Sequence, residues 1–165
     1  MIEAVCFDLG DTLVSEESIV HDEGGHALTA SLVPGAREVL ARTRKEKYKT
    51  ALIANADGIS ARNVIASCSL EDYFDVMVIS GEVGIEKPDT GIFHIALDRL
   101  GVRAGNAVMV GNRINADIHG AKQAGMKSVW FSWDDRYHDT IDSEDAVPDF
   151  VIHHLSELPG ILNLL

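Results

Sequence analysis

The stretch IEAVCFDLGDT at residues 2–12 is an apolar run that ends abruptly in a polar turn. A short run of this kind, partly β-branched and ended by a glycine-containing turn, predicts a buried strand followed by a loop. In an open α/β sheet, ligands bind at the loops outside the carboxyl ends of the strands. Asp8 is therefore a candidate site residue whose carboxylate points outward. The alternative is that Asp8 and Asp11 only cap a turn or a helix start.

Further apolar runs alternate with helical patterns along the rest of the chain. Strands separated by helices of this length predict βαβ units, hence a three-layer, Rossmann-like α/β fold with a mainly parallel sheet, and we expect residues 1–165 to form one domain. Further strands are expected at residues 50–54, 74–79, 107–110, 128–131 and 150–152. Helices are expected at residues 60–67, 89–100 and 155–165, together with one that begins at Pro34 and Gly35 and one that ends at about Ala124.

The bulk composition is that of a globular protein: 46% of the 165 residues are hydrophobic and 24% are charged. The apolar runs are far shorter than the roughly 20 residues that cross a bilayer. The first strand begins so early that we expect no signal peptide. Cys6 and Cys68 lie in apolar surroundings, which indicates reduced thiols and a cytoplasmic protein, with a disulfide as the alternative.

The charge balance excludes some classes of partner. The chain carries 14 Lys and Arg against 26 Asp and Glu, a net charge of -12. Nucleic-acid affinity depends on neutralising phosphates with basic side chains, so we expect no nucleic-acid partner and no docking on an anionic membrane. A small anionic substrate is compatible with this charge, because one divalent cation and a few basic groups reverse the field inside a pocket.

The polar segment at residues 15–29 has little apolar periodicity. We interpret it as a mobile loop with at most one short helix, and residues 13–33 as a flap or minimal cap. His21, Asp22 and His26 could be imagined as metal ligands. Two glycines between them argue against a preformed site, so solvated surface is the favoured interpretation.

With these elements placed, the chain resembles the haloacid dehalogenase (HAD) superfamily of hydrolases, as a small member without a full cap domain. Roughly 40 residues separate Asp8 from the strand at 50–54, too few for such a cap. The motifs that carry the resemblance follow the expected strands in order: FDLGDTL at 7–13, Asn55, GIEKPD at 84–89, and GN at 111–112 with DIHGA at 117–121.

The resemblance implies an aspartate nucleophile and a magnesium ion. Asp8 would attack the substrate, since a carboxylate can form an aspartyl-phosphate. Lys87 would steady the nucleophile and the phosphate. Mg²⁺, which prefers oxygen ligands and keeps several waters, would be held by a set of four residues. These are Asp8, Gly10 through its carbonyl, Asn112 and Asp117.

Three positions depart from the family pattern. Gly10 stands where phosphatases of the family have the aspartate that protonates the leaving group, and the loss of a general acid costs about 10²–10⁴-fold. Ala54 stands at the substrate-binding position where the family usually has Ser or Thr, and Asn55 and Lys87 are the other residues expected to bind substrate. Asn112 replaces a carboxylate, which should weaken Mg²⁺. Asp11 could substitute for the missing acid; alternatively it caps the loop.

Three functions compete. The first is a Mg²⁺-dependent phosphatase that hydrolyses a small phosphorylated substrate through an aspartyl-phosphate. The second is a catalytically degenerate HAD fold that serves as a binding or regulatory module, which the three departures favour. The third is a hydrolase like the 2-haloacid dehalogenases. A site without a cap also makes a homo-oligomer plausible, whereas the substrate's identity is not readable from the sequence.

Overall fold

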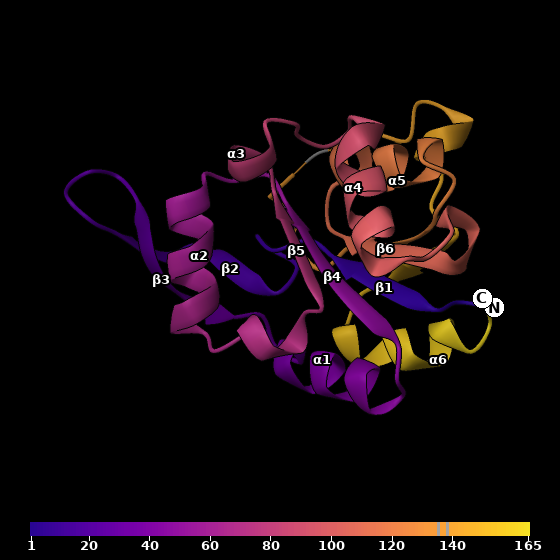
Figure 1. Cartoon of the computed structure of the whole chain (residues 1–165), viewed down its shortest axis with the longest axis horizontal. Coiled ribbons are helices and arrows are strands. Elements are labelled where there is room, and N and C mark those ends of the chain that lie inside the picture. Colours follow the sequence, from indigo (N-terminus) through magenta and orange to yellow (C-terminus); the bar gives the residue numbers. More distant parts are fainter. Residues whose placement is uncertain (135, 138) are drawn as a thin grey trace.

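The computed structural model describes residues 1–134, 136–137 and 139–165. A six-stranded sheet runs through its centre in the order β5-β4-β1-β6-β7-β8, and each neighbouring pair of strands is parallel (Figure 1). The predicted α/β fold with a parallel sheet is confirmed. The strands of this sheet are β1 (Ala4–Phe7), β4 (Lys49–Ala54), β5 (Val76–Ile79), β6 (Ala107–Gly111), β7 (Lys127–Phe131) and β8 (Phe150–Ile152).

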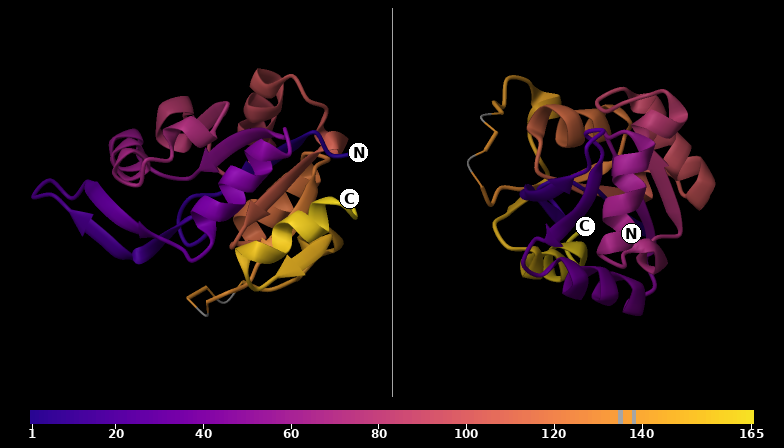
Figure 2. Two further views of the ribbon diagram at one scale, coloured as in Figure 1. Left: turned by 90° about the horizontal axis from the view of Figure 1, so that it is seen from below. Right: turned by 90° about the vertical axis from the view of Figure 1, so that its left-hand side faces the viewer.

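Helices cover both faces of the sheet and complete the three layers (Figure 2). One face is covered by α1 (Ala36–Lys45), α2 (Gly58–Ser67) and α6 (Leu158–Leu162), and the other by α4 (Thr90–Leu100) and α5 (His119–Gln123). The expected terminal helix at 155–165 is shorter than predicted and begins with a 3-10 turn. Shorter helical segments are α3 (Ser80–Val83), a π-helical turn (Ile114–Ile118) and 3-10 turns at Glu71–Tyr73, Ala104–Asn106, Glu144–Ala146 and Leu155–Glu157.

Strand β1 lies in the middle of the sheet and is completely buried. Because side chains alternate along a strand, Val5 and Phe7 pack into the core on one face and Ala4 and Cys6 into the core on the other. Its neighbours β4 and β6 run parallel to it, so the loops after all three strands meet at one edge. The residue that follows β1, Asp8, therefore lies at the centre of that edge.

The interpretation of residues 15–29 as a loop was wrong, because most of them belong to two strands, whereas the role of residues 13–33 as a flap or minimal cap stays a prediction. This region forms an antiparallel hairpin of β2 (Val14–His21) and β3 (Ala27–Leu32), which extends away from the main sheet beside α2 (Figures 1 and 2). Its turn is closed by the Asp22 side chain, which accepts a hydrogen bond from the His26 amide at 2.9 Å. Most hairpin side chains are only partly buried, so polar residues occupy both faces and conceal the alternation typical of a strand.

Further predictions from the sequence can be compared with the structure. Cys6 and Cys68 are both free and buried, as reduced thiols require, and burial raises the pKa of Cys6 to about 12. Within the described residues, none of the helices combines the length and the apolar character needed to cross a bilayer. Asp135 and His138, which follow β7 in an acidic segment of the sequence, lie outside the described residues.

Candidate active site

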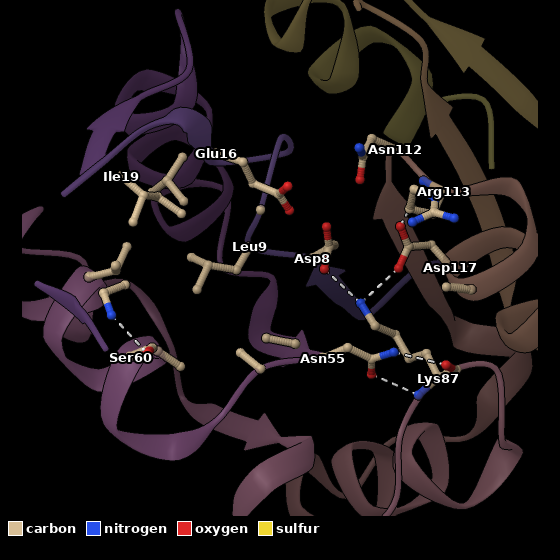
Figure 3. Close-up of a pocket in the computed structure, with 18 of the residues that line it drawn as sticks. Asp8, Leu9, Glu16, Ile19, Asn55, Ser60, Lys87, Asn112, Arg113 and Asp117 are labelled. Carbon is tan, nitrogen blue, oxygen red and sulfur yellow. Dashed lines mark hydrogen bonds and ion pairs between the residues drawn. The ribbon is translucent and has the colours of Figure 1, made fainter. Parts of the chain in front are cut away.

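A pocket of about 190 Å³ opens at the edge of the sheet where β1, β4 and β6 end (Figure 3). One wall is polar and brings together residues from four separate segments. The opposite wall is apolar and comes from the loop after β1, the hairpin and α2. The polar wall contains Asp8, Asn55, Lys87, Asn112, Arg113 and Asp117, and the apolar wall contains Leu9, Val14, Ile19, Ala27, Ala61 and Val64.

Lys87 is the centre of the polar wall. Its ammonium group donates three hydrogen bonds of 2.7 Å, to Asp8 Oδ1, to Asp117 Oδ1 and to the carbonyl of Ile53. Only 4% of the residue is exposed. Burial lowers the pKa of Lys87, but the carboxylates of Asp117 and Asp8 outweigh this effect and hold the pKa above its ordinary value. Lys87 is therefore a fixed positive charge between two acidic side chains.

Asp117 is the more deeply buried of these two acids. Its second oxygen accepts a hydrogen bond of 3.0 Å from the backbone amide of Arg113. Burial, and then the negative charge of Asp8, raise the pKa of Asp117 to about 6, while Lys87 opposes the rise. Asp117 thus orients Lys87, and it lines the pocket together with Asp8.

Asn55 holds the segment that carries Lys87. Its side-chain nitrogen donates to the backbone carbonyl of Lys87 at 2.8 Å, and its side-chain oxygen accepts from the backbone amide of the same residue at 2.8 Å. This double contact links the ends of two loops that are far apart in the sequence. The structure therefore gives Asn55, a predicted substrate-binding residue, a positioning role that sequence reasoning missed. Ala54, its neighbour on β4, lines the pocket with a methyl group only.

A cluster of oxygens lies on the other side of Asp8. The side-chain amide of Asn112 is 3.2 Å from both Asp8 Oδ2 and the Gly10 carbonyl. With its nitrogen turned toward them, the amide donates to both acceptors. With its oxygen turned toward them, three oxygens face one another at a separation close to the roughly 3 Å expected between neighbouring ligands of Mg²⁺. The predicted metal ligands Asp8, Gly10 and Asn112 therefore converge.

The donor set of this cluster is unusual for a metal site. Among the described residues, no three His, Cys, Asp or Glu side chains come together as a metal-binding group. A cation at the oxygen cluster would depend on an amide and a backbone carbonyl as well as on Asp8. Asp117, the fourth predicted ligand, directs both of its oxygens to Lys87 and Arg113 instead. Oxygen donors of this kind suit a hard cation such as Mg²⁺.

Asp11 does not line the pocket. It is fully buried at the base of the hairpin with φ at 53°, and one oxygen accepts a hydrogen bond of 2.8 Å from the Glu16 amide. The other oxygen forms an ion pair of 2.8 Å with Arg136. Burial raises the pKa of Asp11. The structure does not bring Asp11 to Asp8, and its contacts favour the alternative role of a capping residue.

Glu16 is the pocket residue for which the sequence gave no indication. It lies on β2, in the region predicted to be irregular, and its carboxylate points into the same space as that of Asp8 (Figure 3). The hydroxyl of Tyr137 donates a hydrogen bond of 2.7 Å to Glu16 Oε2. Only the register of the hairpin could have revealed this residue, because nothing in its local sequence distinguishes it from Glu17.

Comparisons with known proteins bear on the family of the chain. The model of the haloacid dehalogenase-like hydrolase family matches residues 23–125. A glyceraldehyde 3-phosphate phosphatase of Pyrococcus furiosus is 39% identical over 133 residues, which cover 81% of this chain and 54% of the relative. An N-acylneuraminate-9-phosphatase of Mus musculus is 36% identical over 132 residues, covering 79% and 52%. The chain thus spans about half the length of these curated relatives.

A solved structure supports the fold independently. The crystal structure of a HAD phosphatase from Thermococcus onnurineus superposes with a TM-score of 0.81 and covers 98% of each chain. The sequence identity is 23%, so this likeness concerns the fold alone.

Proposed function

Because the chain belongs to the haloacid dehalogenase-like hydrolase family, we propose that it is a Mg²⁺-dependent phosphatase that acts through an aspartyl-phosphate at Asp8. One observation carries the proposal. Asp8 is held by a buried cation on one oxygen and faces the pocket and the oxygen cluster with the other. A carboxylate in this position is fixed and faces the pocket, as an attacking group must.

In the proposed reaction, an oxygen of Asp8 attacks the phosphorus of a phosphate monoester, and the bond to the leaving oxygen breaks as the new bond forms. Water then attacks the aspartyl-phosphate, which releases inorganic phosphate and regenerates the carboxylate. Lys87 keeps Asp8 oriented throughout, and Asn55 and Asp117 keep Lys87 in place. When bound, Mg²⁺ would supply the charge neutralisation that brings two anions together.

The proposed metal ligands are Asp8, the Gly10 carbonyl and Asn112, with Asp117 acting through Lys87 or through a bound water. Their spacing around the Asn112 amide supports this assignment. The amide of Asn112 predicts a weaker site than a carboxylate at position 112 would give. A readout apart from catalysis is stabilisation by the ion, which amounts to about 2.7 kcal/mol at a concentration of 100 times Kd.

We propose a small phosphate monoester as substrate. The named substrates of two relatives, glyceraldehyde 3-phosphate and N-acylneuraminate 9-phosphate, are small phosphorylated metabolites. The pocket is small, and its apolar wall suits the carbon part of such a molecule. The net charge of -12 disfavours nucleic acids. A homo-oligomer, in which a second copy would help to close the pocket, is part of the same proposal.

The test is hydrolysis of p-nitrophenyl phosphate with Mg²⁺ or with a chelator, by the wild type and by Asp8→Asn. This variant replaces the nucleophile with an amide of the same shape. We expect turnover that requires Mg²⁺ and disappears in the variant. Turnover that survives in Asp8→Asn would exclude Asp8 as nucleophile.

The second candidate is a binding module, favoured by one observation: the Asn112 amide can satisfy Asp8 and Gly10 by itself, without a cation. A wild type that neither hydrolyses the activated substrate nor is stabilised by Mg²⁺ would support that candidate.

A further inference from the structure

The space beside Gly10 is filled by a side chain from the hairpin. A Cβ built on Gly10 would overlap Glu16 Oε1 and would lie 3.2 Å from both Cγ and Cδ of the same residue. The backbone of Gly10 is not in the left-handed region, so its conformation does not require glycine. The carboxylate of Glu16 therefore occupies the place that a side chain two residues after Asp8 would take.

The hairpin holds Glu16 there firmly. The Asp11 amide donates to the Val14 carbonyl at 2.7 Å, and the Glu16 amide donates to Asp11 Oδ1 at 2.8 Å. Asp11 is itself fixed by the ion pair with Arg136. The buried aspartate thus sets the start of β2, and with it the position from which Glu16 reaches the pocket.

The two oxygens of Glu16 have different surroundings. Oε2 accepts the hydrogen bond from Tyr137, whose ring lies under the Arg113 guanidinium at 3.9 Å from its centroid. Oε1 faces Gly10 and the pocket, and no described residue donates a hydrogen bond to it. One oxygen is therefore anchored while the other is free to exchange a proton with a bound molecule (Figure 3).

We propose that Glu16 is the general acid and base of this site, in place of a side chain at position 10. This inference rests on the proposed phosphatase function. In the first step, an oxygen of Asp8 bonds to phosphorus while the bond between phosphorus and the leaving oxygen breaks. The carboxylic acid of Glu16 gives its proton to that leaving oxygen. In the second step, the Glu16 carboxylate takes a proton from the water that attacks the aspartyl-phosphate. The products are one alcohol and inorganic phosphate, and Glu16 ends in its starting state.

The test compares two leaving groups in Glu16→Gln. This change keeps the shape of the side chain and its ability to accept from Tyr137, but removes the exchangeable proton. The ratio kcat/KM reports steps up to departure of the leaving group. An alkyl phosphate needs that proton, whereas p-nitrophenolate leaves without it. We expect kcat/KM to fall about 10²–10⁴-fold for an alkyl phosphate and only a few-fold for p-nitrophenyl phosphate.

The matched control is Glu17→Gln, an exposed glutamate next on the strand, which should leave both values unchanged. A rescue variant adds a second test. Glu16→Ala with Gly10→Asp puts a carboxylate back into the vacated space, and should restore much of the alkyl-phosphate activity lost in Glu16→Ala alone. Thermal unfolding of each variant verifies folding.

The outcomes separate the two proposals. Equal losses for both substrates in Glu16→Gln, or no loss for either, would overturn the role of Glu16 while leaving the phosphatase intact. Absence of turnover by the wild type on p-nitrophenyl phosphate would overturn the phosphatase itself. A failed rescue by the double variant, in a folded protein, would also count against Glu16 as the replacement for a side chain at position 10.

Discussion

Removal of the Lys87 ammonium should destabilise the protein far more than removal of an exposed lysine. In Lys87→Met, Asp8 and Asp117 lose their shared partner, and the Ile53 carbonyl loses a hydrogen bond of 2.7 Å. Breaking a buried ion pair by removing one member costs about 3–5 kcal/mol. Protonation of Asp117, whose pKa is already raised to about 6, limits the penalty to that order.

The assay is unfolding by urea and by heat at neutral pH, with a chelator present so that no divalent cation replaces the lost charge. For a chain of this size, 1 kcal/mol corresponds to a change in Tm of about 2–4 °C, so Tm should fall by about 6–20 °C. Lys49→Met is the matched control. Lys49 also donates to a carbonyl, that of Leu100 at 2.7 Å, but it is exposed. We expect the control to lose less than about 1 kcal/mol.

A second comparison isolates the electrostatic part of the stability lost in Lys87→Met. In the double variant Lys87→Met with Asp117→Asn, only one of the two carboxylates that lost their cation remains, so part of the lost stability should return. The reasoning would be refuted if Lys87→Met and Lys49→Met unfolded at the same urea concentration. That result would mean that the buried charges are solvated or protonated in a way that makes Lys87 dispensable for folding.

Three further predictions concern packing, capping and the metal. Gly120→Ala places a methyl group 2.7 Å from Phe93 Cε2 and should lower the free energy of unfolding by about 1–3 kcal/mol, as measured by urea titration. Asp57→Ala removes the N-cap of α2, which accepts from the Ser60 amide at 2.8 Å, and should cost about 0.5–2 kcal/mol in the same assay. The Ser60 hydrogen bonds lower the pKa of Asp57, so its stabilisation is present at neutral pH and lost as the pH falls through that lowered pKa. Asn112→Asp adds a charge to the oxygen cluster and should lower the Mg²⁺ concentration that half-saturates thermal stabilisation; an unchanged midpoint would place the cation elsewhere.

The sequence was informative wherever a buried strand ends in a polar loop. The order of parallel strands follows from apolar runs that alternate with helices, and the carboxyl ends of such strands share one edge. This was sufficient to predict one site for Asp8, Lys87, Asn112 and Asp117. The structure places these residues in contact with one another or with a common neighbour.

The remainder depended on contacts that no local pattern encodes. The side chain of Asn55 hydrogen-bonds to the backbone of Lys87, which lies in a loop 32 residues further along the chain. The position of Glu16 depends on the register of a half-exposed hairpin, whose polar residues resemble those of a loop. Gly10 looked like the loss of a catalytic group because only the residue in the sequence was visible, and not the side chain that fills its space.

The balance of charge in the pocket provides a last prediction about Glu16. Three carboxylates line the pocket, those of Asp8, Glu16 and Asp117, against the cations Lys87 and Arg113. Arg113 is already paired with Asp139 at 2.9 Å, so its charge is largely compensated. A phosphate group therefore meets a field that is not attractive without an added cation.

Glu16→Gln should consequently separate binding from catalysis. Competitive inhibition by inorganic phosphate measures binding without chemistry, and its inhibition constant should not rise in the variant, because the amide keeps the shape of the side chain and adds no negative charge. In the same variant, kcat/KM for an alkyl phosphate should fall about 10²–10⁴-fold. If the inhibition constant instead rose in proportion to the loss of activity, Glu16 would be a group that holds the substrate, and its position beside Gly10 would have to be explained by binding and not by proton transfer.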